Sequence, residues 1–222
     1  PGKPLVDIGG RCMVEHVYRR AASARCVGRV LVATDDERIV SAVQAFGGQA
    51  VLTRAYHASG TDRIAEVARS LDSEIIVNVQ GDEPALVPAA IEEAVQPLIV
   101  DASVVMSTLG IAMDDRTDPQ NPNVVKVVVD RQGFALYFSR APIPFRRDGA
   151  GGQRAAFRHI GLYVYRRAFL LTLASLPRTP LECAESLEQL RALEYGYRIR
   201  VGETPHDSMS IDTPEDLDRV RR

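Results

Sequence analysis

The first hundred residues alternate between short apolar runs and longer stretches with apolar side chains at helical spacing. Apolar runs within 29–37, 49–53 and 74–79 predict short strands, the last of the kind that is buried in a parallel sheet. The stretches 10–25 and 61–71 carry apolar side chains three and four positions apart, which predicts helices. Repeated β and α units predict a right-handed, mostly parallel α/β sheet with helices on both faces.

The helices of this half have start and stop signals. Thr34 or Asp35 can cap a helix that runs through Phe46, and Gly47 follows as the stop. The helix over 61–71 is expected to turn one apolar face to the core, formed by Ile64, Val67, Ala68 and Leu71.

The pattern changes after about residue 100. Strand-like runs at 102–112, 123–130, 134–140 and 160–167 follow one another with fewer helical stretches between them. This predicts antiparallel additions to the sheet, or a small lobe, within one domain over 1–222. The remaining expected elements are a flexible loop at 146–154, a helix over 183–196 that Gly196 ends, a strand over 198–203 and a closing helix over 212–222.

Composition excludes several classes of protein. The 222 residues are 45% hydrophobic, which is enough for a sizeable core, and 27 basic against 29 acidic side chains give a net charge of −2. Without a block of Lys and Arg, a nucleic-acid partner is not expected. No apolar run of about 18 residues predicts a membrane span, so we expect a soluble cytoplasmic protein. The 3 cysteines are far apart, so neither a disulfide framework nor a zinc site is expected.

The first candidate site is the segment 80–84, Gln-Gly-Asp-Glu-Pro, which directly follows the apolar run 74–79. Ligands of open parallel sheets bind at the carboxyl ends of strands, and Asp82 there can offer a hard oxygen ligand to Mg²⁺. The alternative is that Asp82 and Glu83 only cap the turn before Pro84.

A second acidic position, Asp212, ends a short segment before a helix start. Thr213 as the N-cap and Pro214 at the first helical position explain that start by themselves. Because the cap does not require Asp212, we interpret it as a possible partner of Asp82 on one metal ion.

The segment 59–64 opens a helix with small residues whose backbone N–H groups can face an anion. Capping by Ser59 or Thr61 is the simpler interpretation. Arg63, however, lies in the first turn, where its charge opposes the helix dipole. This indicates another role, such as binding a carboxylate or phosphate.

Three further polar residues are weaker candidates. His159 begins a strand and is either a structural histidine or a ligand contact. Glu188 and Gln189 lie among leucines on a predicted helix, and the simpler interpretation places them on its solvated face.

Several blocks of the chain together resemble one enzyme family, the 3-deoxy-D-manno-octulosonate (KDO) cytidylyltransferases, also called CMP-KDO synthetases. The resemblance runs from Pro1 to the last helix, and the blocks keep one order. They are PGKPL, ATDDERI, SGTDRIAEV, VNVQGDEP, NPNVVKVVVD, ALYFSRAPIPF, RHIGLYVYR, LEQLRALEYG and IDTPEDL.

The resemblance implies a Rossmann-like nucleotidyltransferase fold, a homodimer, and transfer of CMP from CTP to KDO with Mg²⁺, for lipopolysaccharide synthesis. Asp82 and Asp212 resemble the family's catalytic residues, whose carboxylates bind magnesium. Lys3 resembles the lysine of the nucleotide-phosphate loop. The remaining correspondences are Ser59, Gly60 and Thr61 for the cytosine end of CTP, and Arg63, Gln80, His159, Tyr163, Glu188 and Gln189 for KDO.

In one respect the chain departs from the family. Members carry a strand and a phosphate-binding loop immediately before PGKPL, and the sequence begins at Pro1. We expect the sequence to be a fragment of an active enzyme. The alternatives are a cytidylyltransferase for another acidic sugar (8-amino-KDO or sialic acid) and a non-catalytic dimeric nucleotide binder.

Overall fold

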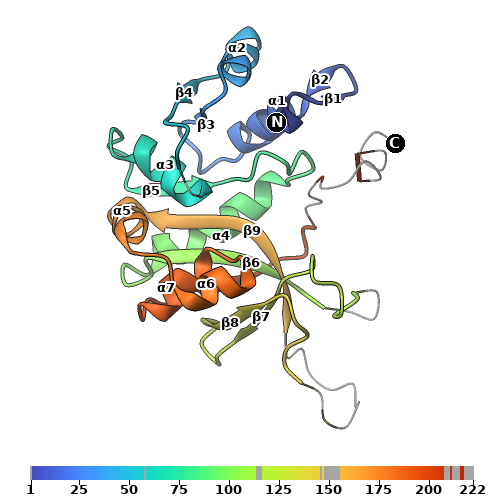
Figure 1. Ribbon diagram of the computed structural model, residues 1–222, viewed down its shortest axis with the longest axis vertical. Coiled ribbons are helices and arrows are strands. Elements are labelled where there is room, and N and C mark those ends of the chain that lie inside the picture. The colour runs from blue at the N-terminus through green and yellow to red at the C-terminus, as the bar shows by residue number, and fades with distance from the viewer. Residues whose placement is uncertain are drawn as a thin grey trace. The chain divides into compact units, whose positions relative to one another are not determined.

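The computed structural model describes residues 2–57, 59–113, 117–145, 147, 156–207, 211 and 216–217. It forms two compact units (Figure 1). The first contains residues 1–73, 77–92 and 206–222, and the second contains 74–76 and 93–205. That the chain is one functional domain stays a prediction.

The first unit contains the predicted β and α alternation. Strands β3 and β4 pair in parallel around helix α2, with Thr34 opposite Leu52. A small hairpin of β1 and β2 precedes α1. The elements are η1 (Lys3–Leu5), β1 (Asp7–Ile8), β2 (Arg11–Cys12), α1 (Met13–Ala22), β3 (Val32–Thr34), α2 (Glu37–Ala45), β4 (Ala50–Leu52), α3 (Gly60–Ala68) and the second half of β5 (Ile75–Asn78).

Two local predictions for this unit were wrong. The cap of α2 is Asp36, not Thr34 or Asp35, because its carboxylate accepts from the Arg38 N–H at 2.9 Å. Helix α3 ends at Ala68, so Leu71 lies outside it. Its buried residues are Thr61, Ala65, Val67 and Ala68, and Ile64 is only half-buried.

Small apolar clusters hold the first unit together. Val14 of α1 packs with Ile39 and Val43 of α2. In a second cluster, Ile211 packs with Ile8 and Met13, which fixes a late segment of the chain against the N-terminal hairpin and α1.

The second unit is built on a mixed sheet with the strand order β10-β6-β9-β7-β8, and β5 pairs with β9 off this path. The α/β class and the antiparallel additions after residue 100 are confirmed. The sheet is mixed because β9 runs antiparallel to both β6 and β7, whereas β10 runs parallel to β6. The elements are α4 (Pro88–Val100, which begins in the first unit), β6 (Met106–Ala112), β7 (Lys126–Val129), β8 (Ala135–Ser139), β9 (Phe157–Arg166), α5 (Arg167–Ser175), α6 (Pro180–Glu185), α7 (Gln189–Glu194) and β10 (Arg200–Glu203).

The two outer strands of this order, β8 and β10, are joined by hydrogen bonds at the start of β8. The Ala135 N–H donates to the Ile199 carbonyl at 2.9 Å, and the Val201 N–H donates to the Gly133 carbonyl at 2.9 Å. The start of β8 thereby covers part of the edge of β10, which removes exposed hydrogen-bonding groups that would invite pairing with another chain.

Helices cover both faces of this sheet, as predicted. In Figure 1, α6 and α7 lie in front of it and α4 lies behind it. The prediction of a single helix over 183–196 was wrong. Ser186 adopts a left-handed conformation (φ 52°, ψ 49°), which ends α6 before α7 begins at Gln189.

Other expectations concern residues at the margins of the described chain. The loop 146–154 lies outside the described residues except for Arg147, and the closing helix lies outside them except for Asp216 and Leu217, which are helical. Among the helices that are described, none is long and apolar enough to cross a membrane. The three cysteines are free.

Candidate active site

Asp82 lies in the turn that follows β5, and its carboxylate binds an ammonium group. Oδ2 accepts a hydrogen bond from Lys3 Nζ at 2.8 Å, and the side chains are 33% and 41% exposed. No backbone N–H within the described residues donates to this carboxylate, so the capping interpretation does not account for Asp82. Glu83, in contrast, is buried.

The backbone of Asp82 is tied to the segment that leads to Asp212. The Ile211 N–H donates to the Asp82 carbonyl at 2.9 Å, and Ile211 itself is buried. Asp212 is the next residue and lies outside the described ones. Within the described part of the chain, no three His, Cys, Asp or Glu side chains gather as a metal site, and a site formed with Asp212 is outside that search.

The start of α3 shows both a cap and open space. The Ser59 hydroxyl accepts from the Asp62 N–H at 3.1 Å, which confirms capping by Ser59. Thr61 is buried. A Cβ atom added at Gly60 would meet nothing within 4 Å, so packing within the protein does not demand glycine there.

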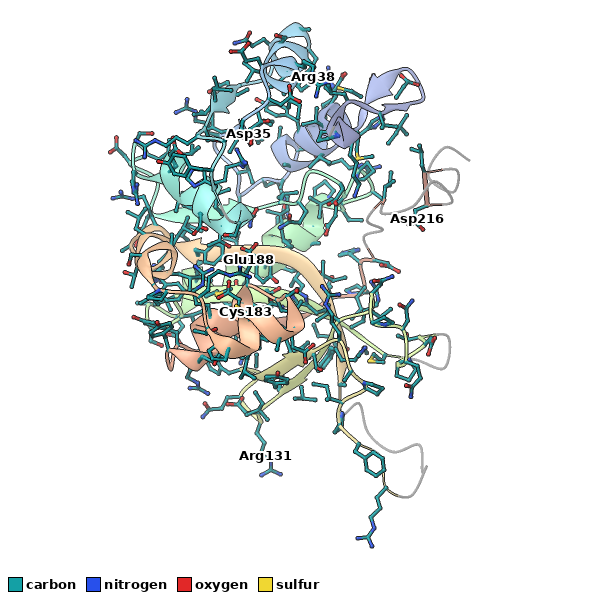
Figure 2. All side chains as sticks on the ribbon, viewed as in Figure 1. Asp35, Arg38, Arg131, Cys183, Glu188 and Asp216 are labelled. Carbon is teal, nitrogen blue, oxygen red and sulfur yellow. The ribbon has the colours of Figure 1, made fainter. Side chains whose placement is uncertain are left out.

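Arg63 is held by two side chains from neighbouring segments. One of its terminal nitrogens donates to the Thr53 hydroxyl at 2.6 Å, and the other donates to the Asp35 carboxylate at 3.1 Å. Asp35 lies just beyond β3 (Figure 2). The pair explains why an arginine is tolerated in the first turn of α3. The guanidinium keeps further N–H donors, because the described residues take up only these two nitrogens.

Sequence reasoning missed Asp35 as the partner of Arg63. A signal was present, because Asp35 follows a strand of the same α/β pattern that singled out Asp82. It was assigned instead to the helix cap, which Asp36 provides.

His159 is a neutral, packed residue of the second unit. Burial, with a smaller contribution from the charge of Arg158, lowers the pKa of His159 to about 3. Its ring meets Phe138 edge-on at a centroid distance of 5.1 Å and lies 5.3 Å from the ring of Tyr163. Nε2 is 2.9 Å from the Thr108 hydroxyl. His159 and Tyr163 are therefore brought together by the structure.

Glu188 and Gln189 lie at the break between α6 and α7, where Figure 2 labels Glu188. The solvated face was the wrong interpretation for Gln189, which is only 4% exposed. Its Nε2 is buried and has no hydrogen-bond partner among the described residues. An unpaired buried donor costs about 1–3 kcal/mol, so this amide is a candidate for a ligand contact.

The sequence-predicted residues divide between the units. The first unit contains Lys3, Ser59, Gly60, Thr61, Arg63, Gln80 and Asp82, and the second contains His159, Tyr163, Glu188 and Gln189. Among these residues, the structure brings Lys3 into contact with Asp82, and His159 into contact with Tyr163.

Known solved structures share the fold of this chain. A structure titled as CMP:2-keto-3-deoxy-manno-octonic acid synthetase complexed with CTP matches with a TM-score of 0.93 and 44% identity, over 100% of this chain and 90% of that one. A 4-diphosphocytidyl-2C-methyl-D-erythritol synthase from Anaerococcus prevotii matches with a TM-score of 0.64 at 12% identity, which shows a shared fold only.

Sequence comparison is equally extensive. A family model described as cytidylyltransferase matches residues 1–199. The 3-deoxy-manno-octulosonate cytidylyltransferase of Syntrophotalea carbinolica is 57% identical over 99% of this chain and 91% of its own length. The enzyme of the same name from Geobacter sulfurreducens is 55% identical over 99% of this chain and 92% of its own length. The chain therefore belongs to the cytidylyltransferase family, and within it to the 3-deoxy-manno-octulosonate cytidylyltransferases.

Proposed function

We propose that the chain transfers CMP from CTP to KDO, giving CMP-KDO and pyrophosphate for lipopolysaccharide biosynthesis. The observation that carries this proposal is the near full-length identity of 55–57% to relatives of that name. The match to a solved synthetase in complex with CTP supports the nucleotide.

The reaction is an in-line displacement at phosphorus. The anomeric hydroxyl of KDO forms a bond to the α-phosphorus of CTP, the bond to the bridging oxygen breaks, and pyrophosphate leaves with that electron pair. The hydroxyl proton passes to solvent. Lys3 is suited to the negative charge of the phosphates, and the open N–H donors of Arg63 are suited to the carboxylate of KDO.

The residues around Asp82 fit a magnesium ion. The Asp82 carboxylate pairs with the ammonium group of Lys3 at 2.8 Å, and this supports the proposal that Asp82 can bind a cation. The hydrogen bond from Ile211 holds the residue before Asp212 against Asp82. We assign Asp82 and Asp212 as the residues that would hold Mg²⁺, which supplies charge neutralisation at the phosphates and a lower pKa for the attacking hydroxyl. A homodimer in the cytoplasm remains part of the proposal.

The test is pyrophosphate release from CTP and Mg²⁺, measured with KDO, with 8-amino-KDO, with sialic acid and with no sugar. We expect release that depends on KDO and a product with the mass of CMP-KDO. Release with another sugar alone would reassign the substrate. Nucleotide binding without release would identify a non-catalytic binder.

Replacing Gln189 with Leu is expected to separate stability from substrate affinity. The change removes a buried donor that has no partner in the described chain, so the free energy of unfolding should stay the same or rise by up to about 1 kcal/mol. The KM for KDO should rise about ten-fold, because the amide is then missing from the sugar site, whereas the KM for CTP should not change.

The matched control is Gln44→Leu, on the exposed side of α2 in the first unit. It should change neither KM. A clear loss of stability in Gln189→Leu, with an unchanged KM for KDO, would contradict the assignment of this amide to the substrate.

A further inference from the structure

A β-bulge interrupts the pairing of β6 with β9. Thr108 pairs with Tyr163 and the next residue, Leu109, pairs with Ile160, so two residues of β9 have no partner on β6. A bulge bends its strand and re-aims the side chains around it. In a straight strand, the Cα atoms of residues four positions apart are separated by about 13 Å. The rings of His159 and Tyr163 nevertheless lie 5.3 Å apart.

The Thr108 hydroxyl lies within this bulge and meets three polar atoms. It is 2.8 Å from the Leu162 carbonyl, 3.1 Å from the Ile160 carbonyl and 2.9 Å from His159 Nε2. The side chain is fully buried, so no solvent competes for it.

Proton accounting fixes the roles of these atoms. A hydroxyl carries one hydrogen, and the two carbonyls can only accept. If the hydroxyl donated to His159, both bulge carbonyls would lose this donor in a buried place, which is the costlier arrangement. The hydroxyl therefore donates to the carbonyls, and His159 Nε2 donates to the hydroxyl. A neutral ring with a proton on Nε2 carries a lone pair on Nδ1.

Nδ1 is left as an acceptor. None of the described residues hydrogen-bonds it, and the ring is held in place by Phe138 and Tyr163. An acceptor at this position can receive a hydrogen bond from a hydroxyl or an ammonium group. It cannot bind the carboxylate of a sugar acid, because a carboxylate offers no hydrogen.

We propose that Thr108 is a positioning residue that holds His159 in the Nε2–H tautomer, so that Nδ1 accepts a hydrogen bond from a hydroxyl of the sugar acid. The proposal rests on the proposed function and on the family resemblance, which implies that His159 contacts KDO. In this proposal His159 binds a hydroxyl of the sugar acid and takes no part in binding its carboxylate.

The tautomer is measured directly by two-bond ¹H–¹⁵N correlation NMR of the His159 ring in the wild-type protein without ligand. We expect an Nε2–H ring between pH 6 and 8. Thr108→Val keeps the side-chain shape but removes the acceptor for Nε2–H. It should shift the ring away from this tautomer and raise the KM for KDO about ten-fold, with kcat and the KM for CTP within about two-fold. Thr108→Ser should restore the wild-type tautomer and the wild-type KM for KDO. The exposed control Thr172→Val should change neither the tautomer nor this KM.

The outcomes separate this proposal from the proposed function. An Nδ1–H ring in the wild type would overturn it, and so would a KM for KDO unchanged in a folded Thr108→Val protein. If that variant does not fold, the wild-type spectrum still decides. An Nε2–H ring in a protein that releases no pyrophosphate with KDO would leave the Thr108 contact standing and refute the assigned reaction.

Discussion

Asp82→Asn is expected to lower kcat at least about a hundred-fold while the protein stays folded. The change removes one negative charge from a residue that we assign to the metal ion at the reacting phosphates, and losing one such electrostatic contribution costs about 10²–10³ in turnover or more. The fold should tolerate it, because the Asp82 side chain bonds Lys3 in a half-exposed pair. Pairs of this kind contribute about 0–1 kcal/mol to stability.

The measurement is pyrophosphate release under saturating CTP and KDO, together with thermal unfolding and Mn²⁺ binding in the presence of CTP. Asp72→Asn, at an exposed position of the same unit, is the matched control and should keep wild-type turnover. We expect Asp82→Asn to lose Mn²⁺ affinity as well as turnover. Wild-type turnover in this variant would refute the assignment, whereas an unfolded variant would show that Asp82 is structural.

The position of Asp82 was predictable because it follows from local periodicity. A continuous apolar run ending at 79 marks a strand end, and Asp82 lies in the turn behind it, where its carboxylate meets Lys3. The parallel pairing of β3 with β4 likewise follows from the repeated β and α pattern.

What the sequence could not show depends on contacts between distant segments. Thr108 is one β-branched residue of an ordinary strand until β9 places two carbonyls and His159 around its hydroxyl. Gln189 follows Glu188 in a helical pattern that looks solvated, and only the break at Ser186 turns its amide inward. A left-handed serine has no local signature as strong as glycine.

A buried ion pair that no sequence pattern indicated joins the two helices on either side of this break. Glu182 of α6 and Arg191 of α7 are 1% and 3% exposed, and the two guanidinium nitrogens contact the carboxylate at 2.5 and 2.8 Å. Glu182 also accepts from the Thr179 N–H at 3.3 Å at the start of α6. One carboxylate therefore caps α6 and fixes α7 against it.

Glu182→Ala is accordingly expected to lower the free energy of unfolding by about 3–5 kcal/mol, because it removes the carboxylate that two guanidinium nitrogens of the buried Arg191 contact. Replacing both residues with apolar ones, in Glu182→Leu with Arg191→Met, should cost much less, since no buried charge remains. Urea unfolding of the wild type, the single variant and the double variant measures both differences. Glu37→Ala, at an exposed position of α2, is the control and should stay within about 0.5 kcal/mol of the wild type.

The pair also predicts how stability changes with pH. Burial alone would raise the pKa of Glu182, but the hydrogen bonds and charge of Arg191 hold this pKa below its ordinary value. A carboxyl whose pKa is lowered by folding stabilises the protein above its ordinary pKa, and this contribution is lost as the pH falls through the folded pKa. Acidification from pH 7 to well below 4.5, the ordinary pKa of a glutamate, should therefore reduce the stability of the wild type more than that of the double variant. The ion pair would not be what holds α6 to α7 if the free energy of unfolding changed equally with pH in the wild type and the double variant. The same conclusion would follow if Glu182→Ala were as stable as the double variant.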